Sequence, residues 1–103
     1  MPIMEISIVP VGTKRASLSS YVAEAIKVLR TQKGIKYTLT AMGTIIEARS
    51  LKQLFDIAHL MHSAILRGNV TRVVTSIKID DRKDKKITMH GKTQSVQRKL
   101  GHI

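Results

Sequence analysis

Alternation of apolar and polar side chains predicts strands in the first half of the chain. From Ile3 to Val9 every second residue is strongly apolar, and Pro10 ends the pattern. A period of two is typical of a β-strand with one face against a core. The β-rich stretches 35–41 and 44–49 are separated by a short turn at 42–43, so we expect them to form a hairpin.

Two further stretches have helical periodicity together with start or stop signals. Ser17 precedes an apolar stripe at helical spacing and Gly34 follows it, which predicts a helix over about 18–33. Ser50, with a glutamine three residues later, forms a capping box in front of a second apolar stripe. We therefore expect a second helix over about 51–67.

The last third of the chain begins with β-branched residues and ends in a basic tail. Residues 70–80 predict a fourth strand, and the charged run 80–86 predicts a solvated loop after it. Beyond this loop, weakly spaced apolar residues predict a short helix over about 91–100. We expect that helix to dock on a neighbour.

The order of these elements predicts an α+β architecture. It is that of a ferredoxin-like βαββαβ sandwich with antiparallel sheet order 4-1-3-2, both main helices on one face, and a short C-terminal helix. A chain of 103 residues with 43% apolar content is expected to form one domain, 1–103. No apolar run approaches the ~20 residues of a membrane span, and the first residues lack a basic region, so we expect a cytoplasmic protein.

In this topology the strand residues divide between two faces of the sheet. One set is expected to pack against the helices and form the core. It comprises Met4, Ile6, Ile8, Tyr37, Leu39, Ile46, Ala48, Val73, Ile77 and Ile79.

The opposite, uncovered face is mixed rather than uniformly polar. It includes Val9, Met42, Ile45 and Val74. A cluster of exposed apolar side chains is typical of a surface that a partner or a ligand covers. We expect self-association, and Leu60 on the outer side of the second helix points the same way.

Two carboxylates are predicted on adjacent central strands of that uncovered face. Glu5 and Glu47 would repel each other unless a cation or a proton intervenes. Lys78 and Arg49 could supply the cation in a structural ion-pair network, and a cationic ligand is the alternative. Carboxylate pairs also serve as general acid and base, but no nucleophile, metal-ligand set or phosphate-binding glycine pattern accompanies this pair. We therefore expect no catalytic activity.

The histidines give no metal-binding pattern. His59 and His62 are three residues apart on the second predicted helix, without an acidic third ligand nearby in the sequence. We expect them to be structural, and the sequence predicts no resident metal or cofactor.

A serine-rich segment follows the first predicted strand. Gly12 and then Ser17, Ser19 and Ser20 offer hydroxyls and backbone N–H groups at a helix start, which are the ingredients of an anion or hydrogen-bonding site. Capping of the helix by Ser17 is the simpler interpretation of that residue.

The charge of the chain raises the question of nucleic acid. There are 18 Lys and Arg against 7 Asp and Glu, a net charge of +11, and 8 of the basic residues lie in the last 26 positions. RNA-recognition domains of the same strand order stack bases on aromatic residues of the central strands, where this chain has none. The charge run predicts at most weak nonspecific phosphate binding through the tail.

Four segments in the right order resemble one known family over nearly the whole chain. The family is the thiamine-binding protein family, a group of small conserved proteins long without an assigned function. The segments are Ile8-Val9-Pro10-Val11-Gly12-Thr13, Ser17-Leu18-Ser19-Ser20-Tyr21-Val22, Met42-Gly43-Thr44-Ile45-Ile46-Glu47 and Lys78-Ile79-Asp80-Asp81-Arg82-Lys83.

The resemblance implies a ferredoxin-like fold, a homotetramer built from dimers, and noncatalytic binding of thiamine or its hydroxymethylpyrimidine moiety. By the same likeness, Glu47 would bind the cation or a ring nitrogen, Ser19 and Thr44 would make polar contacts, and Met42 would form an apolar wall. Lys78 would hold the carboxylates in place. Carried over by motif, the candidate ligand-binding residues are Glu5, Ser17, Ser19, Met42, Gly43, Thr44, Glu47, Lys78 and Asp80.

Two other functions stay open on the sequence alone. One is a structural or regulatory oligomer whose sheet face serves subunit contact without a small ligand. The other is a weak nonspecific nucleic-acid binder that acts through the basic C-terminal tail.

Overall fold

The computed structural model describes residues 1–12, 19–67 and 70–101 of the chain. These residues form four strands and three helices. In chain order they are β1 (Ile3–Pro10), α1 (Ser19–Leu29), β2 (Lys36–Leu39), β3 (Thr44–Glu47), α2 (Leu51–Leu66), β4 (Val73–Asp80) and α3 (Met89–Leu100).

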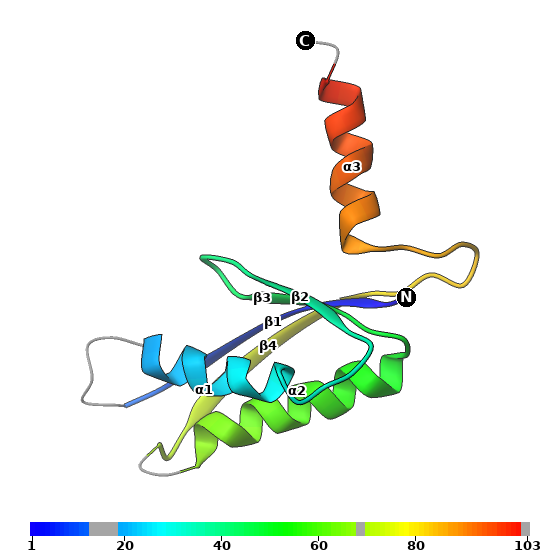
Figure 1. Cartoon of the computed structure of the whole chain (residues 1–103). Coiled ribbons are helices and arrows are strands. Elements are labelled where there is room, and N and C mark those ends of the chain that lie inside the picture. The colour runs from blue at the N-terminus through cyan, green and yellow to red at the C-terminus, as the bar shows by residue number, and fades with distance from the viewer. Residues whose placement is uncertain (13–18, 68–69, 102–103) are drawn as a thin grey trace.

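The four strands form one antiparallel sheet in the order β2-β3-β1-β4. Helices α1 and α2 cover one face of this sheet, and α3 stands on the other (Figure 1). The predicted ferredoxin-like arrangement is thus confirmed, including both crossover helices on the same face. We call the face opposite α1 and α2 the open face.

The hydrophobic core lies between the sheet and the two crossover helices. Met4 and Ile46 from the central strands and Leu54 and Ile57 from α2 are fully buried. Burial of this apolar surface is the main favourable contribution to folding, at about 25 cal/mol per Å² removed from water.

The edge strands depart from the predicted core. Tyr37 and Leu39 on β2 and Ile77 on β4 share the helix-facing side with their neighbours, as the strand pairing requires. They are nevertheless 39%, 57% and 41% exposed. The two helices fully bury apolar residues of the central strands β1 and β3 but leave these edge residues partly open to solvent.

The first helix ends earlier than predicted. The N–H of Thr31 donates to the carbonyl of Val28 at 3.1 Å, which tightens the last turn after Leu29. Gly34 follows at a φ of +75°, the left-handed conformation that favours glycine. A Cβ at this position would come within 2.6 Å of Nε of Arg49, so the end of that flexible side chain would have to move, and the positive φ is the stronger reason for glycine. The predicted cap Ser17 lies outside the described residues.

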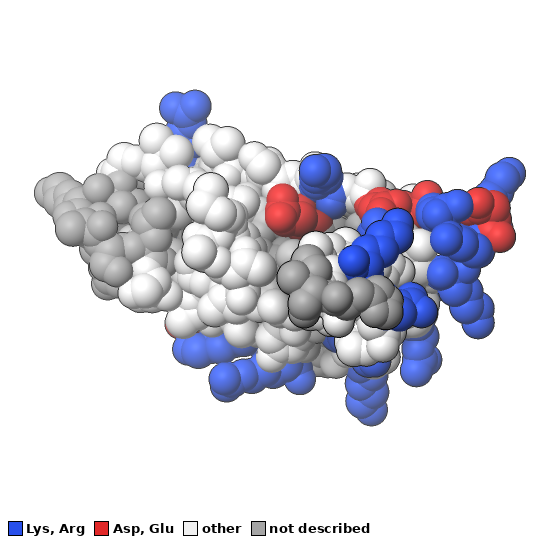
Figure 2. Space-filling model, turned by 90° about the horizontal axis from the view of Figure 1, so that it is seen from above, with Lys and Arg blue, Asp and Glu red and all other residues white. Residues whose placement is uncertain are grey.

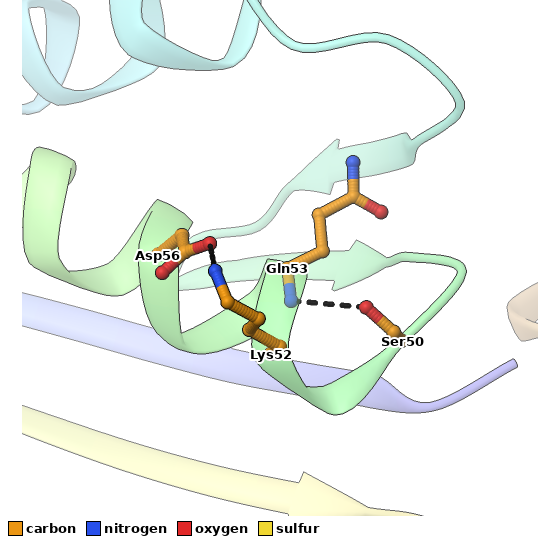
Figure 3. Close-up of polar contacts among 4 residues, drawn as sticks. All are labelled: Ser50, Lys52, Gln53 and Asp56. Atoms are coloured by element: carbon orange, nitrogen blue, oxygen red, sulfur yellow. Dashed lines mark hydrogen bonds and ion pairs between the residues drawn. The ribbon is translucent and has the colours of Figure 1, made fainter.

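The capping box of the second helix is confirmed (Figure 3). The Ser50 hydroxyl accepts from the N–H of Gln53 at 3.1 Å, and the Gln53 side chain accepts from the N–H of Arg49 at 3.1 Å. The Gln53 amide also donates to the carbonyl of Lys33 at 3.0 Å, which ties the start of α2 to the segment before β2. These bonds satisfy backbone groups that a helix start leaves unpaired.

The hairpin loop is longer than the predicted turn at 42–43. Strand β2 ends at Leu39 and β3 begins at Thr44, which leaves residues 40–43 as the loop. The Thr40 hydroxyl holds this loop together by donating to the carbonyl of Gly43 at 2.7 Å. The same hydroxyl accepts from the N–H groups of Met42 and Gly43. A side chain that satisfies this many loop groups allows a four-residue connection in place of a two-residue one.

We predict that Leu54→Ala lowers the free energy of unfolding by about 2–5 kcal/mol, because the deletion leaves a cavity in a fully buried site. The matched control Leu66→Ala removes the same atoms from a residue of the same helix that is 41% exposed, and should cost about 1 kcal/mol or less. Urea unfolding at one protein concentration measures both. Equal losses would contradict this location of the core.

Candidate functional site

Strand pairing fixes which residues share the open face. Directly paired residues of antiparallel strands point to the same side, so each set of partners forms a row across the sheet. In the order β2, β3, β1, β4, one row is Lys36, Glu47, Ile3 and Asp80, and the next is Thr38, Ile45, Glu5 and Lys78.

The two predicted carboxylates therefore share the open face on adjacent strands. Glu5 lies opposite Ile45, so Glu47 is its diagonal neighbour rather than its direct partner. Lys78 is the direct strand partner of Glu5 on β4, but no ion pair joins their side chains among the described residues, so its compensating role stays a prediction. Arg49 was wrongly predicted to share that role: it follows the end of β3, its guanidinium group lies against Gly34, and it does not line the pocket described next.

A pocket of about 780 Å³ lies between these two rows and the first turn of α3. Figure 2 shows the molecule from the side of α3, with Lys and Arg side chains gathered at one end around Asp and Glu side chains. Both signs of charge thus occur together on this side of the molecule. The pocket is lined by Ile3, Glu5, Lys36, Tyr37, Thr38, Ile45, Glu47, Lys78, Asp80, Thr88, Met89, His90, Lys92 and Thr93.

Glu47 holds the start of α3 on the sheet. Its carboxylate accepts a hydrogen bond from the N–H of Met89 at 2.8 Å, and the residue is only 2% exposed. Thr88 caps the same helix end by accepting from the N–H of Gly91 at 2.9 Å. A negative charge at a helix N-terminus is favourable because the first N–H groups are unpaired and the helix dipole is positive there.

A second contact holds α3 to the edge strand. Nζ of Lys92 lies 2.6 Å from a carboxylate oxygen of Asp80 at the end of β4. Ile87, just before the helix, is buried at 7% exposure. In the connecting loop, Arg82 Nε donates to Asp84 at 2.8 Å, and this hydrogen bond lowers the pKa of the Asp84 carboxyl from its ordinary value. The loop pair is exposed and adds little stability.

Four of the nine candidate ligand-binding residues line this pocket: Glu5, Glu47, Lys78 and Asp80. Met42, Gly43 and Thr44 instead line a separate hollow of about 250 Å³ at the hairpin loop. Thr44 is buried on the helix-facing side, since it pairs with Ile6.

The serines of the predicted hydrogen-bonding segment also lie apart from the pocket. Ser19 lines another hollow, between α1 and the end of β2. Ser17 lies outside the described residues.

Sequence reasoning missed the contribution of α3. Its first turn supplies Met89, His90, Lys92 and Thr93 to the pocket, but the sequence predicted that the helix starts at 91. The signal was present, because Thr88 three residues before Gly91 is a helix N-cap. Lys36, on the edge strand, lines the pocket as well and was not among the predicted site residues.

Metal binding finds no support in the described residues, where no group of three or more His, Cys, Asp or Glu side chains could hold an ion. His62 instead shares a hydrogen bond with the hydroxyl of Thr75 at 2.7 Å, which agrees with a structural role. Among the helices of the described ranges, none combines the length and continuous apolar sequence that crossing a membrane requires.

These features define a small ferredoxin-like domain with a ligand-sized pocket on its open sheet face. Residues 4–97 match the family model of the thiamine-binding protein. The chain therefore belongs to the thiamine-binding protein family, as its sequence motifs predicted.

Similar proteins cover nearly the whole chain. The UPF0045 protein YqgV of Bacillus subtilis is 42% identical over 103 residues, covering 97% of this chain and 98% of that protein. A UPF0045 protein of Methanothermobacter thermautotrophicus is 38% identical over 96 residues, covering 93% and 96%. The crystal structure of the hypothetical protein MJ1052 from Methanocaldococcus jannaschii aligns with a TM-score of 0.79 at 37% identity, covering 99% and 97%.

We predict that Glu47→Ala loosens α3 from the sheet. The substitution removes the acceptor for the Met89 N–H and should raise the hydrogen-exchange rates of the α3 amides about 10-fold or more, as expected for a lost charge-assisted hydrogen bond. Glu47→Gln keeps an acceptor oxygen and should give a smaller increase. Glu5→Ala is the matched control, since that carboxylate is on the same face but exposed. Unchanged protection of α3 in Glu47→Ala would contradict the anchoring role.

Proposed function

We propose that the protein is a noncatalytic binding protein for thiamine or its hydroxymethylpyrimidine moiety. The observation that carries the proposal is the open-face pocket, where the Glu5 carboxylate stands among apolar walls in a member of the thiamine-binding protein family. Its volume of about 780 Å³ is in the range of small-molecule sites.

The chemistry of the walls suits this class of ligand. Thiamine combines a positively charged ring with an aminopyrimidine that donates and accepts hydrogen bonds. Glu5 offers a carboxylate to the cation, while Ile3, Ile45 and Met89 offer apolar contact to the rings. The Thr38 hydroxyl can donate to a ring nitrogen, and the Thr93 hydroxyl, which donates to the carbonyl of His90 at 3.0 Å, can accept from the amino group.

Glu47 has a different role in this proposal from the one that its motif implies. Because it is buried and bonded to α3, it shapes the pocket by fixing the helix that forms one wall. Glu5 is exposed, and its carboxylate makes no hydrogen bond or ion pair within the described ranges, so it is the carboxylate that remains available to a ligand.

Assembly into a homotetramer built from dimers is part of the proposal. The accessible surface is 7488 Å², against about 5,800 Å² for a compact monomer of this mass. The radius of gyration of 15.4 Å likewise exceeds the ~13 Å expected for about 100 residues.

Helix α3 is an exposed part of the molecule (Figure 1). It projects from the sheet, none of its residues is buried, and Val96 and Leu100 are each 56% exposed (Figure 1). An isolated helix of 12 residues is marginal in water, which favours packing of α3 against another copy. The same surface supports the second candidate function, a structural or regulatory oligomer without a small ligand.

We predict that isothermal titration calorimetry detects binding of thiamine or of hydroxymethylpyrimidine. Glu5→Gln should weaken thiamine binding about 10-fold, because the substitution removes the available negative charge and keeps the size of the side chain. Glu24→Gln is the matched control, since that residue lies on α1 and pairs with Lys27.

The outcomes of this titration distinguish the binding protein from the structural oligomer and test the role of Glu5. No heat with either compound would refute the ligand and leave the structural oligomer. Equal weakening by both variants would show that Glu5 has no special part in binding.

We predict that the wild-type protein sediments as a tetramer and that the double variant Val96→Asp, Leu100→Asp has a lower mass. Buried carboxylates would oppose packing of α3 against a second copy. Sedimentation equilibrium measures the masses, and Lys99→Asp is a control on the same helix. A monomeric wild type would refute the assembly.

A further inference from the structure

The hollow at the hairpin loop differs in chemistry from the open-face pocket. Its volume is about 250 Å³, and none of the described residues that line it is Asp, Glu, Lys, Arg or His. Charged residues make up 24% of the whole chain, so the uncharged lining sets this place apart from most of the surface. We call it the hairpin hollow.

The hairpin hollow results from the unequal lengths of two central strands. Strand β3 pairs with residues 3–6 of β1, whereas β1 continues to Pro10 along β4 on its other side. Beyond Ile6 the hairpin loop lies beside β1, and a Cβ on Gly43 would come within 3.0 Å of the carbonyl oxygen of Ile6. Met61 and Ile65, two core residues of α2, also line the hollow, which therefore opens onto one end of the hydrophobic core.

One polar group of the lining belongs to the interior of the fold. Thr44 is only 4% exposed, on the helix-facing side of β3, and its hydroxyl makes no hydrogen bond to any described residue. Its oxygen is not sealed from solvent, since the described residues include no fully enclosed side-chain oxygen or nitrogen atom without a partner. Burial of a hydroxyl without a hydrogen bond is unfavourable, so this group favours a bound partner in the hollow.

The other hydroxyls of the lining are engaged or lie on the other face. The Thr40 hydroxyl donates to the carbonyl of Gly43 and accepts from the N–H groups of Met42 and Gly43. Ser7 is two residues from Glu5 in β1 and therefore belongs to the open face. The hairpin hollow thus combines an apolar floor with one available hydroxyl, which can donate and accept hydrogen bonds.

From this combination we infer that the hairpin hollow is a second binding site, for an uncharged ring of about the size of benzene that carries one hydrogen-bonding group. An apolar cavity of about 150 Å³ is enough to bind benzene, so the volume suffices. A charged ligand would lose its hydration here without meeting an opposite charge. The inference goes beyond the proposed function and is independent of it, because the open-face pocket shares no described residue with this hollow.

Titration with three ring compounds, followed by the amide signals of the protein in NMR spectra, tests the inference. Phenol is uncharged at pH 7 and carries a hydroxyl, toluene lacks the hydrogen-bonding group, and benzoate is an anion. Phenol should shift the amide signals of residues 40–44 and bind roughly 10-fold more tightly than benzoate, although the net charge of +11 by itself favours the anion. It should bind roughly 5-fold more tightly than toluene, as expected for one hydrogen bond.

The variant Thr44→Val tests the hydroxyl directly. It should remove the preference for phenol over toluene, because a methyl group replaces the hydroxyl with little change in size. It should leave the thermal midpoint of unfolding unchanged or raise it, since the hydroxyl has no partner in the fold to lose. Thr71→Val alters an exposed threonine outside the hollow and should keep the preference.

Four results would overturn the inference. The first three are equal or tighter binding of benzoate, unshifted signals of residues 40–44, and a preference for phenol that survives in Thr44→Val. The fourth is a lower unfolding midpoint of Thr44→Val, because the hydroxyl would then have a structural partner.

A fifth result would assign the hairpin hollow to a second copy of the chain and would also overturn the inference. It is a shift of the same amide signals when the protein is diluted without any probe. None of these results affects the proposed function, which calorimetry with thiamine tests separately.

Discussion

The pairing register of β1 with its two neighbours is the constraint on which the rest of this structure depends. Because strand side chains alternate between faces, the register places Met4 and Ile6 in the core and Ile3 and Glu5 on the open face. A shift of one residue would bury Glu5 and expose the core set. The hydrophobic effect therefore fixes the register. The register in turn decides which residues of the four strands lie side by side on the open face and form the floor of the pocket.

The pocket depends next on one buried carboxylate. Glu47 belongs to the sheet, but its hydrogen bond to the N–H of Met89 fixes a helix that follows it by more than 40 residues. None of the residues of α3 is buried, so polar contacts at its first turn, rather than apolar packing, hold much of the helix in place. A residue of a ligand-binding motif thus acts here as a structural anchor, and the wall it anchors belongs to the proposed site.

Net charge is a poor guide to this site. The chain is strongly basic, yet the groups around the pocket balance, because each carboxylate of the two rows lies beside a lysine on the next strand or on α3. Charge acts on a ligand over about 10 Å or less at ordinary salt, so the nearest side chains outweigh the total. The exposed basic loop at 81–86 belongs to the outside of the molecule.

The sequence by itself determined the fold, the strand faces and the capping box at Ser50, because these follow from local periodicity and short-range hydrogen bonds. It also identified Glu5 and Glu47 as neighbours on one face. Only the tertiary structure decided that the motif residues Met42 to Thr44 lie apart from the pocket, and that α3 completes it. The contact between Glu47 and Met89 joins segments far apart in the chain, and no local pattern specifies which distant N–H group a buried carboxylate will meet.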